Sequence, residues 1–198
     1  MRLILASQSS ARRAVLDAAG VTFEAMAPMV DEDGAKAALR ADGISPRDLA
    51  DALAELKARK LSQRFPADLV LGCDQTLSLD DGTMFDKPES LTALKAQLTI
   101  LSGKTHNLWS AAVLAQGGTA IWRYVERCKM TIRPLSESFI DQYIEAEGDV
   151  LLGCVGGYRI EGFGIQLFNH IEATHFGILG LPLIPLLDIL RIRGVIPS

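Results

Sequence analysis

Residues 5–16 read LASQSSARRAVL, and this stretch indicates the fold because it passes from a strand through a turn into a helix. Residues 3–6 form a short apolar run, which the polar residues 7–10 end. Residues 11–19 then have helical composition, and Gly20 supplies a stop signal. A strand followed at once by a helix is the unit from which α/β proteins are built, so the chain begins with one such unit.

The turn between this strand and this helix carries groups that suit an anion. A helix N-terminus offers unpaired N–H groups and partial positive charge, and the hydroxyls of Ser7 and Ser9 add donors. Arg12 and Arg13 fall in the first helical turn, where the helix dipole disfavours cations unless an anion lies nearby. The patterns GxxxxGK[ST] and GxGxxG are both missing here. Two interpretations stay open, a phosphate site and a pair of solvated surface arginines.

The composition of the 198 residues restricts the partners of the protein. Hydrophobic residues make up 48% and charged residues 22%, which predicts a single globular domain over residues 1–198. The net charge of −4 argues against coating of nucleic acid or of an anionic membrane, so neither partner is expected. The widely spaced Cys73, Cys128 and Cys154 predict neither a disulfide framework nor a zinc site. Because no signal-peptide pattern is visible either, we expect a cytoplasmic location.

Apolar periodicity and turn residues predict the other elements. Expected strands cover residues 21–27, 69–74, 106–115 and 120–132, a hairpin turns at Asp81-Gly82, and expected helices cover residues 46–64, 91–101, 136–148 and 178–190. Ser45, Pro46 and Asp48 form a helix-start signal for the first of these helices. The last is too short for a membrane span. Hairpins and strand–helix units together predict a mixed, twisted sheet flanked by helices, in two lobes with a central cleft.

Acidic residues stand at two places where they could carry chemistry. Asp74 directly follows the apolar run of residues 69–73, and open α/β sheets place their sites at the carboxyl ends of strands. A carboxylate there could take a proton from water or hold a metal ion, although a turn or helix-cap aspartate is the plainer interpretation. Asp31 and Glu32 form a second acidic pair, which a solvated loop would also explain.

Three lysines are candidate cations for the same chemistry. The helix predicted over residues 46–64 has an apolar stripe made of Leu49, Leu53 and Leu56. Helical phase puts Lys60 near the middle of that stripe and Lys57 on its flank, so one of them would extend along apolar surface or reach a site. Lys87 precedes Pro88 directly after the hairpin, where the restricted backbone could aim a cation, although a surface lysine is the plainer interpretation.

These residues together resemble the Maf family of nucleoside triphosphate pyrophosphatases. The matching segments, in the order of the family, are LASQS (5–9) with RR (12–13), AP (27–28) with DE (31–32), LA (53–54) with KA (57–58), GCDQ (72–75), KP (87–88), LSGKTH (101–106), EGFG (161–164) and GLPL (180–183). One such segment would be weak evidence, whereas eight in this order span almost the whole chain.

The resemblance implies a role for each matching residue. Asp74 would be the catalytic acid–base group, and the resemblance favours Lys57 over Lys60. Phosphate would be bound by Ser7, Ser9, Arg12, Arg13, Lys57 and Lys87, and a divalent cation (Mg²⁺, Mn²⁺ or Co²⁺) by Glu32 and Asp74. The family hydrolyses the α–β linkage of a nucleoside triphosphate to the monophosphate and pyrophosphate. Cationic groups would neutralise charge on the transferring phosphorus and on the leaving pyrophosphate. His106 could orient this site or be structural.

Three further positions bear on which base is bound, because in this family they vary with the substrate. Gln75 and Glu161 resemble the subgroup that acts on 7-methyl-GTP, and a carboxylate could accept hydrogen bonds from the N1–H and 2-amino groups of guanine. Ala11 departs from the aromatic residue that this subgroup can carry, and an alanine cannot stack on a base. The alternative substrates are dTTP, UTP and CTP.

The resemblance implies a Maf/ITPase-like fold and a house-cleaning enzyme that removes modified nucleotides from the precursor pool. Since the family has also been linked to septum formation, a nucleotide-sensing regulator without hydrolysis is the alternative from another class. A sensor needs the cationic residues to bind the nucleotide, but it needs no acidic side chain positioned to activate a water molecule. The presence of Asp74 and Glu32 therefore favours the enzyme. Members of the family often pair, so a homodimer is a further expectation.

Overall fold

The computed structural model describes residues 1–197, which divide into two compact units. Unit 1 comprises residues 1–75, 109–126 and the chain from Thr174 onward, and unit 2 comprises residues 76–108 and 127–173. The units are therefore interleaved in sequence. Among the described residues, no helix is both long and apolar enough to cross a membrane.

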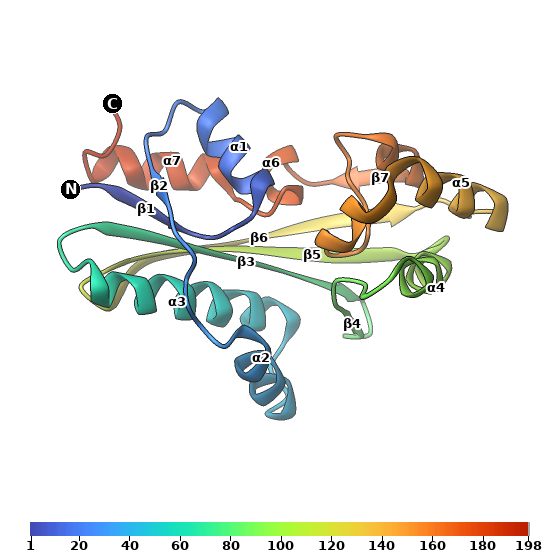
Figure 1. The fold of residues 1–198 in the computed structure, drawn as a ribbon, viewed down its shortest axis with the longest axis horizontal. Coiled ribbons are helices and arrows are strands. Elements are labelled where there is room, and N and C mark those ends of the chain that lie inside the picture. Colours follow the sequence, from blue (N-terminus) through green and yellow to red (C-terminus); the bar gives the residue numbers. More distant parts are fainter. Residues whose placement is uncertain (198) are drawn as a thin grey trace. The chain divides into compact units, whose positions relative to one another are not determined.

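The secondary structure is a mixed seven-stranded sheet with helices. In chain order the elements are β1 (Leu3–Ala6), α1 (Ser10–Ala18), β2 (Glu24–Ala25), α2 (Glu32–Ala41), α3 (Pro46–Arg64), β3 (Leu69–Leu79), β4 (Met84–Phe85), α4 (Leu91–Leu101), β5 (Thr105–Gln116), β6 (Thr119–Ile132), α5 (Glu137–Glu147), the 3₁₀ helices η1 (Gly148–Gly153) and η2 (Phe163–Leu167), β7 (Phe168–Glu172), α6 (His175–Ile178) and α7 (Leu183–Ile192) (Figure 1). The strand order is β2-β1-β3-β5-β6-β7, and β4 pairs with β3. β1 runs parallel to β2 and β3, whereas the pairs β3–β4 and β6–β7 are antiparallel, so the predicted α/β class with a mixed sheet is confirmed.

Unit 1 has a core on each face of its strands, because side chains alternate along β1. Leu3 and Leu5 belong to a buried cluster with residues of α1 and α7. Ile4 and Ala6 belong to a second cluster, which includes Leu61 of α3. Figure 1 shows α1 and α7 on one side of β1 and α3 on the other. The strand–turn–helix at the start of the chain is therefore the centre of unit 1.

α3 packs on the sheet through small residues, and the stripe predicted from its leucines was partly wrong. Leu56 is 37% exposed, whereas Ala50, Ala54 and Ala58 are fully buried. A Cβ on Gly72 of β3 would lie 2.7 Å from the Ala58 backbone nitrogen and would also overlap the Ala54 carbonyl oxygen. The alanines and the missing side chain of Gly72 together allow the helix backbone to approach β3 closely.

Replacing Gly72 with alanine is expected to push α3 away from β3. The added methyl would meet main-chain atoms, which cannot turn aside as a flexible side chain can. We expect the free energy of unfolding, measured by urea denaturation, to fall by about 1–3 kcal/mol. Gly153→Ala is the matched control, since a Cβ there meets nothing within 4 Å. Equal stability of the two variants would contradict this close packing.

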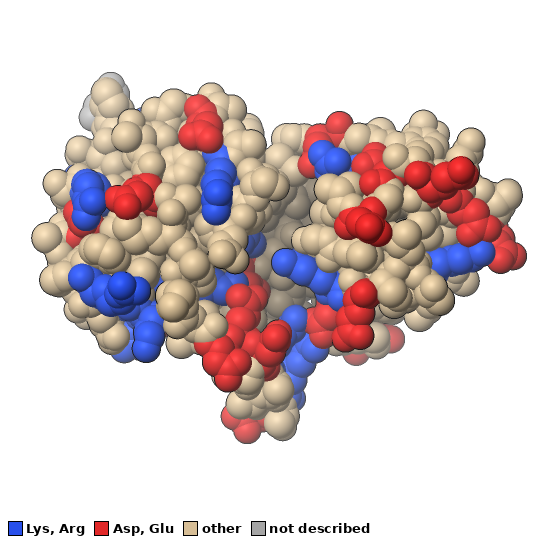
Figure 2. Space-filling model, in the orientation of Figure 1, with Lys and Arg blue, Asp and Glu red and all other residues tan. Residues whose placement is uncertain are grey.

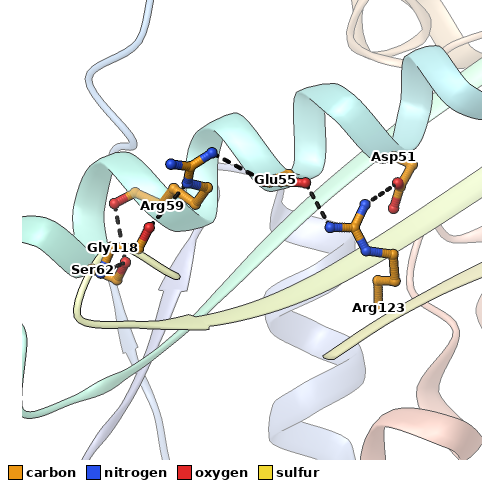
Figure 3. Close-up of polar contacts among 6 residues, drawn as sticks. All are labelled: Asp51, Glu55, Arg59, Ser62, Gly118 and Arg123. Carbon is orange, nitrogen blue, oxygen red and sulfur yellow. Dashed lines mark hydrogen bonds and ion pairs between the residues drawn. The ribbon is translucent and has the colours of Figure 1, made fainter. Parts of the chain in front are cut away.

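The solvent side of α3 is tied to the β5–β6 hairpin by ion pairs and a hydrogen bond (Figure 3). Arg123 of β6 pairs with Asp51 and, at 2.7 Å, with Glu55. The Arg59 side chain donates to the Gly118 carbonyl oxygen at 3.0 Å. These contacts fix the rotation of α3, and with it the direction of the side chains on its inner face.

Unit 2 has its own core around α4, α5 and the end of the sheet. Leu94 and Leu98 of α4 and Tyr143 of α5 are fully buried. The predicted hairpin is confirmed, since Leu77 pairs with Phe85 and Gly82 has a φ of +88°, which favours glycine.

Several segments differ from the sequence prediction. The acidic stretch, which a solvated loop would also have explained, is the N-terminal end of α2, capped by Asp31, and no residue of α2 is buried. The strand expected over residues 21–27 pairs only at Glu24–Ala25. The helix expected over residues 178–190 is two helices, α6 and α7, because Pro182 stands at the N-cap of α7. β7 and the 3₁₀ helices were not predicted.

Candidate functional site

Asp74 lies within a strand, not at the end of one as predicted. β3 continues to Leu79, so the sequence boundary at Asp74 was wrong. The strand that does end here is its neighbour, because β1 pairs with β3 only as far as Ala6 opposite Gly72. Asp74 therefore stands two residues beyond the last pair with β1, and the alternation of the strand turns it to the same face as Gly72, toward α3.

Lys57 brings two carboxylates together on that face. Its Nζ lies 2.6 Å from Oδ1 of Asp74 and 2.7 Å from Oε2 of Glu32. The side chains of Lys57 and Asp74 are 7% and 8% exposed, whereas that of Glu32 is 45% exposed. Lys60 is exposed. Of the two candidate lysines, the structure thus places Lys57 beside the candidate catalytic acid.

The environment of Asp74 shifts its proton affinity. Burial raises the pKa of its carboxyl above the ordinary value of 3.8, and the charges of Lys57 and Arg12 act in the opposite direction. The nearby Glu32 carboxylate raises the pKa further. A buried carboxyl with a raised pKa and specific cationic neighbours is a candidate for transferring protons in a reaction.

Arg12 is held at the N-terminal turn of α1 by neutral oxygen atoms. Its Nε donates to the Gly180 carbonyl oxygen at 2.9 Å, and its Nη1 donates to the Cys73 carbonyl oxygen at 3.1 Å and to Oγ of Ser7 at 3.2 Å. Within residues 1–197 no carboxylate forms an ion pair with this guanidinium. Its positive charge, next to the helix N-terminus, therefore stays available for an anion.

The other candidates in the opening stretch lie nearby but make fewer contacts. Ser9 caps α1, because its Oγ accepts from the Arg12 backbone N–H at 3.4 Å. Arg13 is exposed, and its side chain forms no hydrogen bond or ion pair with the described residues. Successive residues of a helix point about 100° apart, so only one of the two arginines can face the Cys73 carbonyl. Ala11 is half-buried in the first turn.

Charge elsewhere on the molecule is mixed. On the face drawn in Figure 2, Lys and Arg side chains are interspersed with Asp and Glu side chains. With a net charge of −4 over the whole chain, attraction of a polyanion depends on local groups such as Arg12 and Lys57.

Gln75 has its side chain bound inside unit 1. Its Nε2 donates to Oγ of Ser110 at 2.8 Å, to the Ile178 carbonyl oxygen at 3.0 Å and to the Gly177 carbonyl oxygen at 3.2 Å. Ser110 is fully buried and donates to the Gly177 carbonyl oxygen at 2.7 Å. Ser110 was not predicted, since a lone serine within an apolar strand gives no signal in the sequence.

Lys87 and Glu161 both belong to unit 2. The Glu161 carboxylate lies 3.3 Å from Nε of Arg159, whose Nη1 is 3.5 Å from the Glu147 carboxylate. Burial raises the pKa of the Cys154 thiol, as does the charge of Glu161, whereas the charges of Arg159 and Lys87 lower it. Lys87 and Glu161 therefore act on one region of unit 2. Arg159 was not predicted, although its place two residues before Glu161 was a usable signal.

His106 and Cys73 have structural surroundings. Nε2 of His106 lies 2.7 Å from the Tyr158 hydroxyl, and burial lowers the pKa of His106 to about 4, so its ring is neutral at pH 7. Burial raises the pKa of the Cys73 thiol to about 11, which keeps it protonated, and it belongs to the core cluster of unit 1. The protonated thiol of Cys73 therefore does not meet the requirements of a nucleophile at neutral pH, and the ring of His106 is fully buried and bound to Tyr158.

The carboxylates at Lys57 fit one kind of metal site. In the part of the chain that the structure describes, no group of three or more His, Cys, Asp or Glu side chains could hold an ion. Glu32 and Asp74 do converge on a single cationic point, the ammonium of Lys57. Mg²⁺ is usually held by one or two carboxylates together with water and substrate phosphates, so this donor pair suits an ion that arrives with a polyphosphate.

Comparisons with known proteins agree on one family. The family model described as Maf-like protein matches residues 2–193. A nucleoside triphosphate pyrophosphatase of Caulobacter vibrioides is 54% identical over 192 residues, which is 97% of this chain and 96% of that protein. A nucleoside triphosphate pyrophosphatase of Sphingopyxis alaskensis is 49% identical over the full length of both chains. A 7-methyl-GTP pyrophosphatase of Rhizobium meliloti is 48% identical over 99% of this chain and 98% of that protein.

Proposed function

This chain belongs to the Maf family, and from that premise we propose that it is a nucleoside triphosphate pyrophosphatase. Water would attack the α-phosphorus, the bond from that phosphorus to the oxygen bridging to the β-phosphorus would break, and the products would be the nucleoside monophosphate and pyrophosphate. The observation that carries this proposal is the buried Asp74 carboxylate paired with Lys57 and close to the unpaired charge of Arg12. These groups supply a proton acceptor and cations next to the carboxyl end of β1.

Each residue of this group has a task that follows from its chemistry. The guanidinium of Arg12, the hydroxyl of Ser7 and the α1 N-terminus would bind phosphate oxygens, because all three offer donors or positive charge. Lys57 would neutralise negative charge that develops as the linkage breaks. Asp74 would orient the attacking water and take its proton, a role to which its raised pKa is suited. Lys87 keeps the phosphate-binding role that the family resemblance implies.

We further propose a divalent cation held by Glu32 and Asp74. When bound, such an ion supplies charge stabilisation to phosphate oxygens. The contribution of the protein is the pair of carboxylates, which Lys57 keeps within reach of each other. Loss of activity with a chelator, and its return with Mg²⁺, Mn²⁺ or Co²⁺, would support this part of the proposal.

The reaction is tested by measuring pyrophosphate release from a panel of normal and methylated nucleoside triphosphates with each of these ions. We expect stoichiometric monophosphate and pyrophosphate from at least one nucleotide. Release of inorganic phosphate instead would mean that another linkage is cleaved. Nucleotide binding without any turnover would contradict the enzyme and support the sensing role.

For the substrate we propose 7-methyl-GTP. Glu161 could accept two hydrogen bonds from the guanine edge, and its negative charge would favour the positive ring of the methylated base. Two similar relatives, at 47% and 48% identity, are named 7-methyl-GTP pyrophosphatase. Ala11 offers no stacking surface, so base selection would rest on Glu161 more than on the residue at position 11. Turnover of dTTP, UTP or CTP in preference would contradict this choice.

Glu161→Gln is expected to weaken selection of 7-methyl-GTP over UTP by about 10- to 100-fold, because a hydrogen-bonded pair to a base edge is worth about 1–3 kcal/mol of discrimination. The amide can accept at only one atom and carries no charge. The measurement is kcat/KM for both nucleotides. Glu145→Gln, at an exposed glutamate of the same unit, is the matched control and should change neither value. An equal loss for both nucleotides would remove the base-reading role.

A further inference from the structure

The amide nitrogen of Gln75 is bound within the protein. Its two N–H hydrogens are shared among three oxygens, those of Ser110, Gly177 and Ile178, at 2.8–3.2 Å. Ser110 is completely buried, and its hydroxyl donates in turn to the Gly177 carbonyl oxygen. A side chain whose donors are all bound to buried or main-chain oxygens is poorly placed to donate to a base as well.

The acceptors of Gln75 belong to a short segment that also holds Arg12. Gly177 and Ile178 are the last residues of α6, and the Gly180 backbone N–H donates back to the Gly177 carbonyl oxygen at 3.0 Å. Gly180 has a φ of +84°, and its carbonyl oxygen accepts from Nε of Arg12 at 2.9 Å. Residues 177–180 thus form a turn with Gln75 bound at one end and Arg12 at the other.

This turn determines how the guanidinium of Arg12 is presented. Nε and Nη1 are used by the Gly180 and Cys73 carbonyl oxygens and by Ser7, whereas Nη2 makes no hydrogen bond to residues 1–197. A Cβ on Gly180 would lie 3.2 Å from both Nε and Nη2, so the turn is packed directly against the guanidinium. Movement of residues 177–180 would therefore change the direction in which Nη2 of Arg12 points.

We propose that Gln75 is a positioning residue that fixes the turn of residues 177–180 and so aims Arg12 at the phosphate chain of the substrate. The inference rests on the proposed function, because it takes Arg12 as a phosphate ligand. Gln75 then affects how the polyphosphate end of every nucleotide is bound. Ser110 shares this role, since it binds both the Gln75 amide and the Gly177 carbonyl oxygen.

The test uses inorganic tripolyphosphate, a probe that has no base. Its dissociation constant is measured by calorimetry for the full chain and for the variants Gln75→Leu and Ser110→Ala, together with kcat/KM for 7-methyl-GTP, UTP and dTTP. Gln75→Leu keeps most of the side-chain volume and removes the amide. We expect both variants to weaken tripolyphosphate binding about tenfold, the order of one hydrogen bond to a charged group, and to lower kcat/KM by the same factor for all three nucleotides.

The matched control is Ser62→Ala, also in unit 1. Ser62 is fully buried and makes two hydrogen bonds, to the Arg59 carbonyl oxygen and from the Gly118 backbone N–H (Figure 3). This variant loses a buried hydroxyl just as Ser110→Ala does, but away from residues 177–180. We expect a similar loss of thermal stability with unchanged tripolyphosphate binding. In an Arg12→Lys background, Gln75→Leu should have no further effect on tripolyphosphate binding.

Three outcomes would contradict the positioning role of Gln75, and a fourth would contradict the proposed function. Unchanged tripolyphosphate binding with altered base selection in Gln75→Leu would overturn the inference and make Gln75 a base reader. The same weakening in Ser62→Ala, or an undiminished effect of Gln75→Leu in the Arg12→Lys background, would also overturn it. Absence of pyrophosphate release by the unaltered chain would instead contradict the proposed function, whichever way the tripolyphosphate measurements fall.

Discussion

Asp74→Asn is expected to lower the rate of pyrophosphate release by about 10²–10⁴-fold, the range of a positioned general base. Asparagine has nearly the same shape, so it fits the buried position beside Lys57, but its amide cannot take a proton from water. Arg12 and Ser7 remain in place, so nucleotide binding measured by calorimetry should be largely retained. A loss in kcat with little change in affinity is the signature of a group that acts in the chemical step.

The matched control for this variant is Asp188→Asn. Asp188 is an exposed aspartate of α7 in the same unit, and its partner among residues 1–197 is Arg191. Its substitution should leave pyrophosphate release unchanged, because a surface ion pair contributes little. Turnover retained by Asp74→Asn would show that another group activates water. Loss of nucleotide binding in that variant would show that Asp74 serves mainly to organise the cationic side chains.

Lys57→Met is expected to lower the free energy of unfolding by about 3–5 kcal/mol at neutral pH, the usual cost of removing one partner of a buried ion pair. The side chains of Lys57 and Asp74 are both more than nine-tenths buried, so the charged form of Asp74 would lose its ion-pair partner, leaving the charge of Arg12 to favour it and that of Glu32 to oppose it. Methionine fills similar volume, so the loss comes mainly from the charge and not from a cavity. Urea unfolding monitored at several pH values is the measurement.

The loss of stability in Lys57→Met should depend on pH in a predictable direction. Burial already raises the pKa of Asp74, and without the opposing effect of Lys57 the pKa would be higher still. A carboxyl whose pKa is raised by folding stabilises the fold below its unfolded-state pKa, and this contribution disappears as the pH rises through the folded-state pKa. The deficit of Lys57→Met should therefore be largest near neutral pH and should shrink on acidification, as Asp74 takes up a proton.

Lys60→Met is the control, since Lys60 lies one turn along the same helix and is exposed. Its stability should be within about 0.5 kcal/mol of the unaltered chain, as for most surface substitutions. A loss in Lys57→Met that does not vary with pH would contradict a charge effect and would indicate altered packing of α3.

The sequence predicted most of the regular elements because their signals are local. Ser45 and Pro46 begin α3 as expected, and Ser136 and Gly148 bound α5. α2 was missed because none of its residues is buried and its apolar face consists of alanines, with Leu39 as its single large apolar side chain. The end of β3 was misplaced because an aspartate after an apolar run suggests a boundary, whereas here the strand continues and it is β1 that ends.

The contacts of the candidate site depend on distant residues, and only part of them could be predicted. Helical phase alone favoured Lys60, because the leucines were counted as the buried stripe while the alanines that actually pack were not. Side-chain size determines which face of α3 packs on the sheet, since small residues let the helix approach Gly72 of β3 closely. The bonds from Arg12 to Gly180 and from Gln75 to Ser110 cross 168 and 35 positions of the chain, and no local pattern specifies such pairs.

The interleaving of the two units has a consequence for biosynthesis. Leu3 and Leu5 of β1 are buried in the same cluster as Leu186 and Leu190 of α7, so β1 is covered by a helix that leaves the ribosome after the whole of unit 2. β1 therefore lacks part of its cover while unit 2 is synthesised. During that time its apolar surface is exposed to other molecules, a situation in which chaperones limit aggregation.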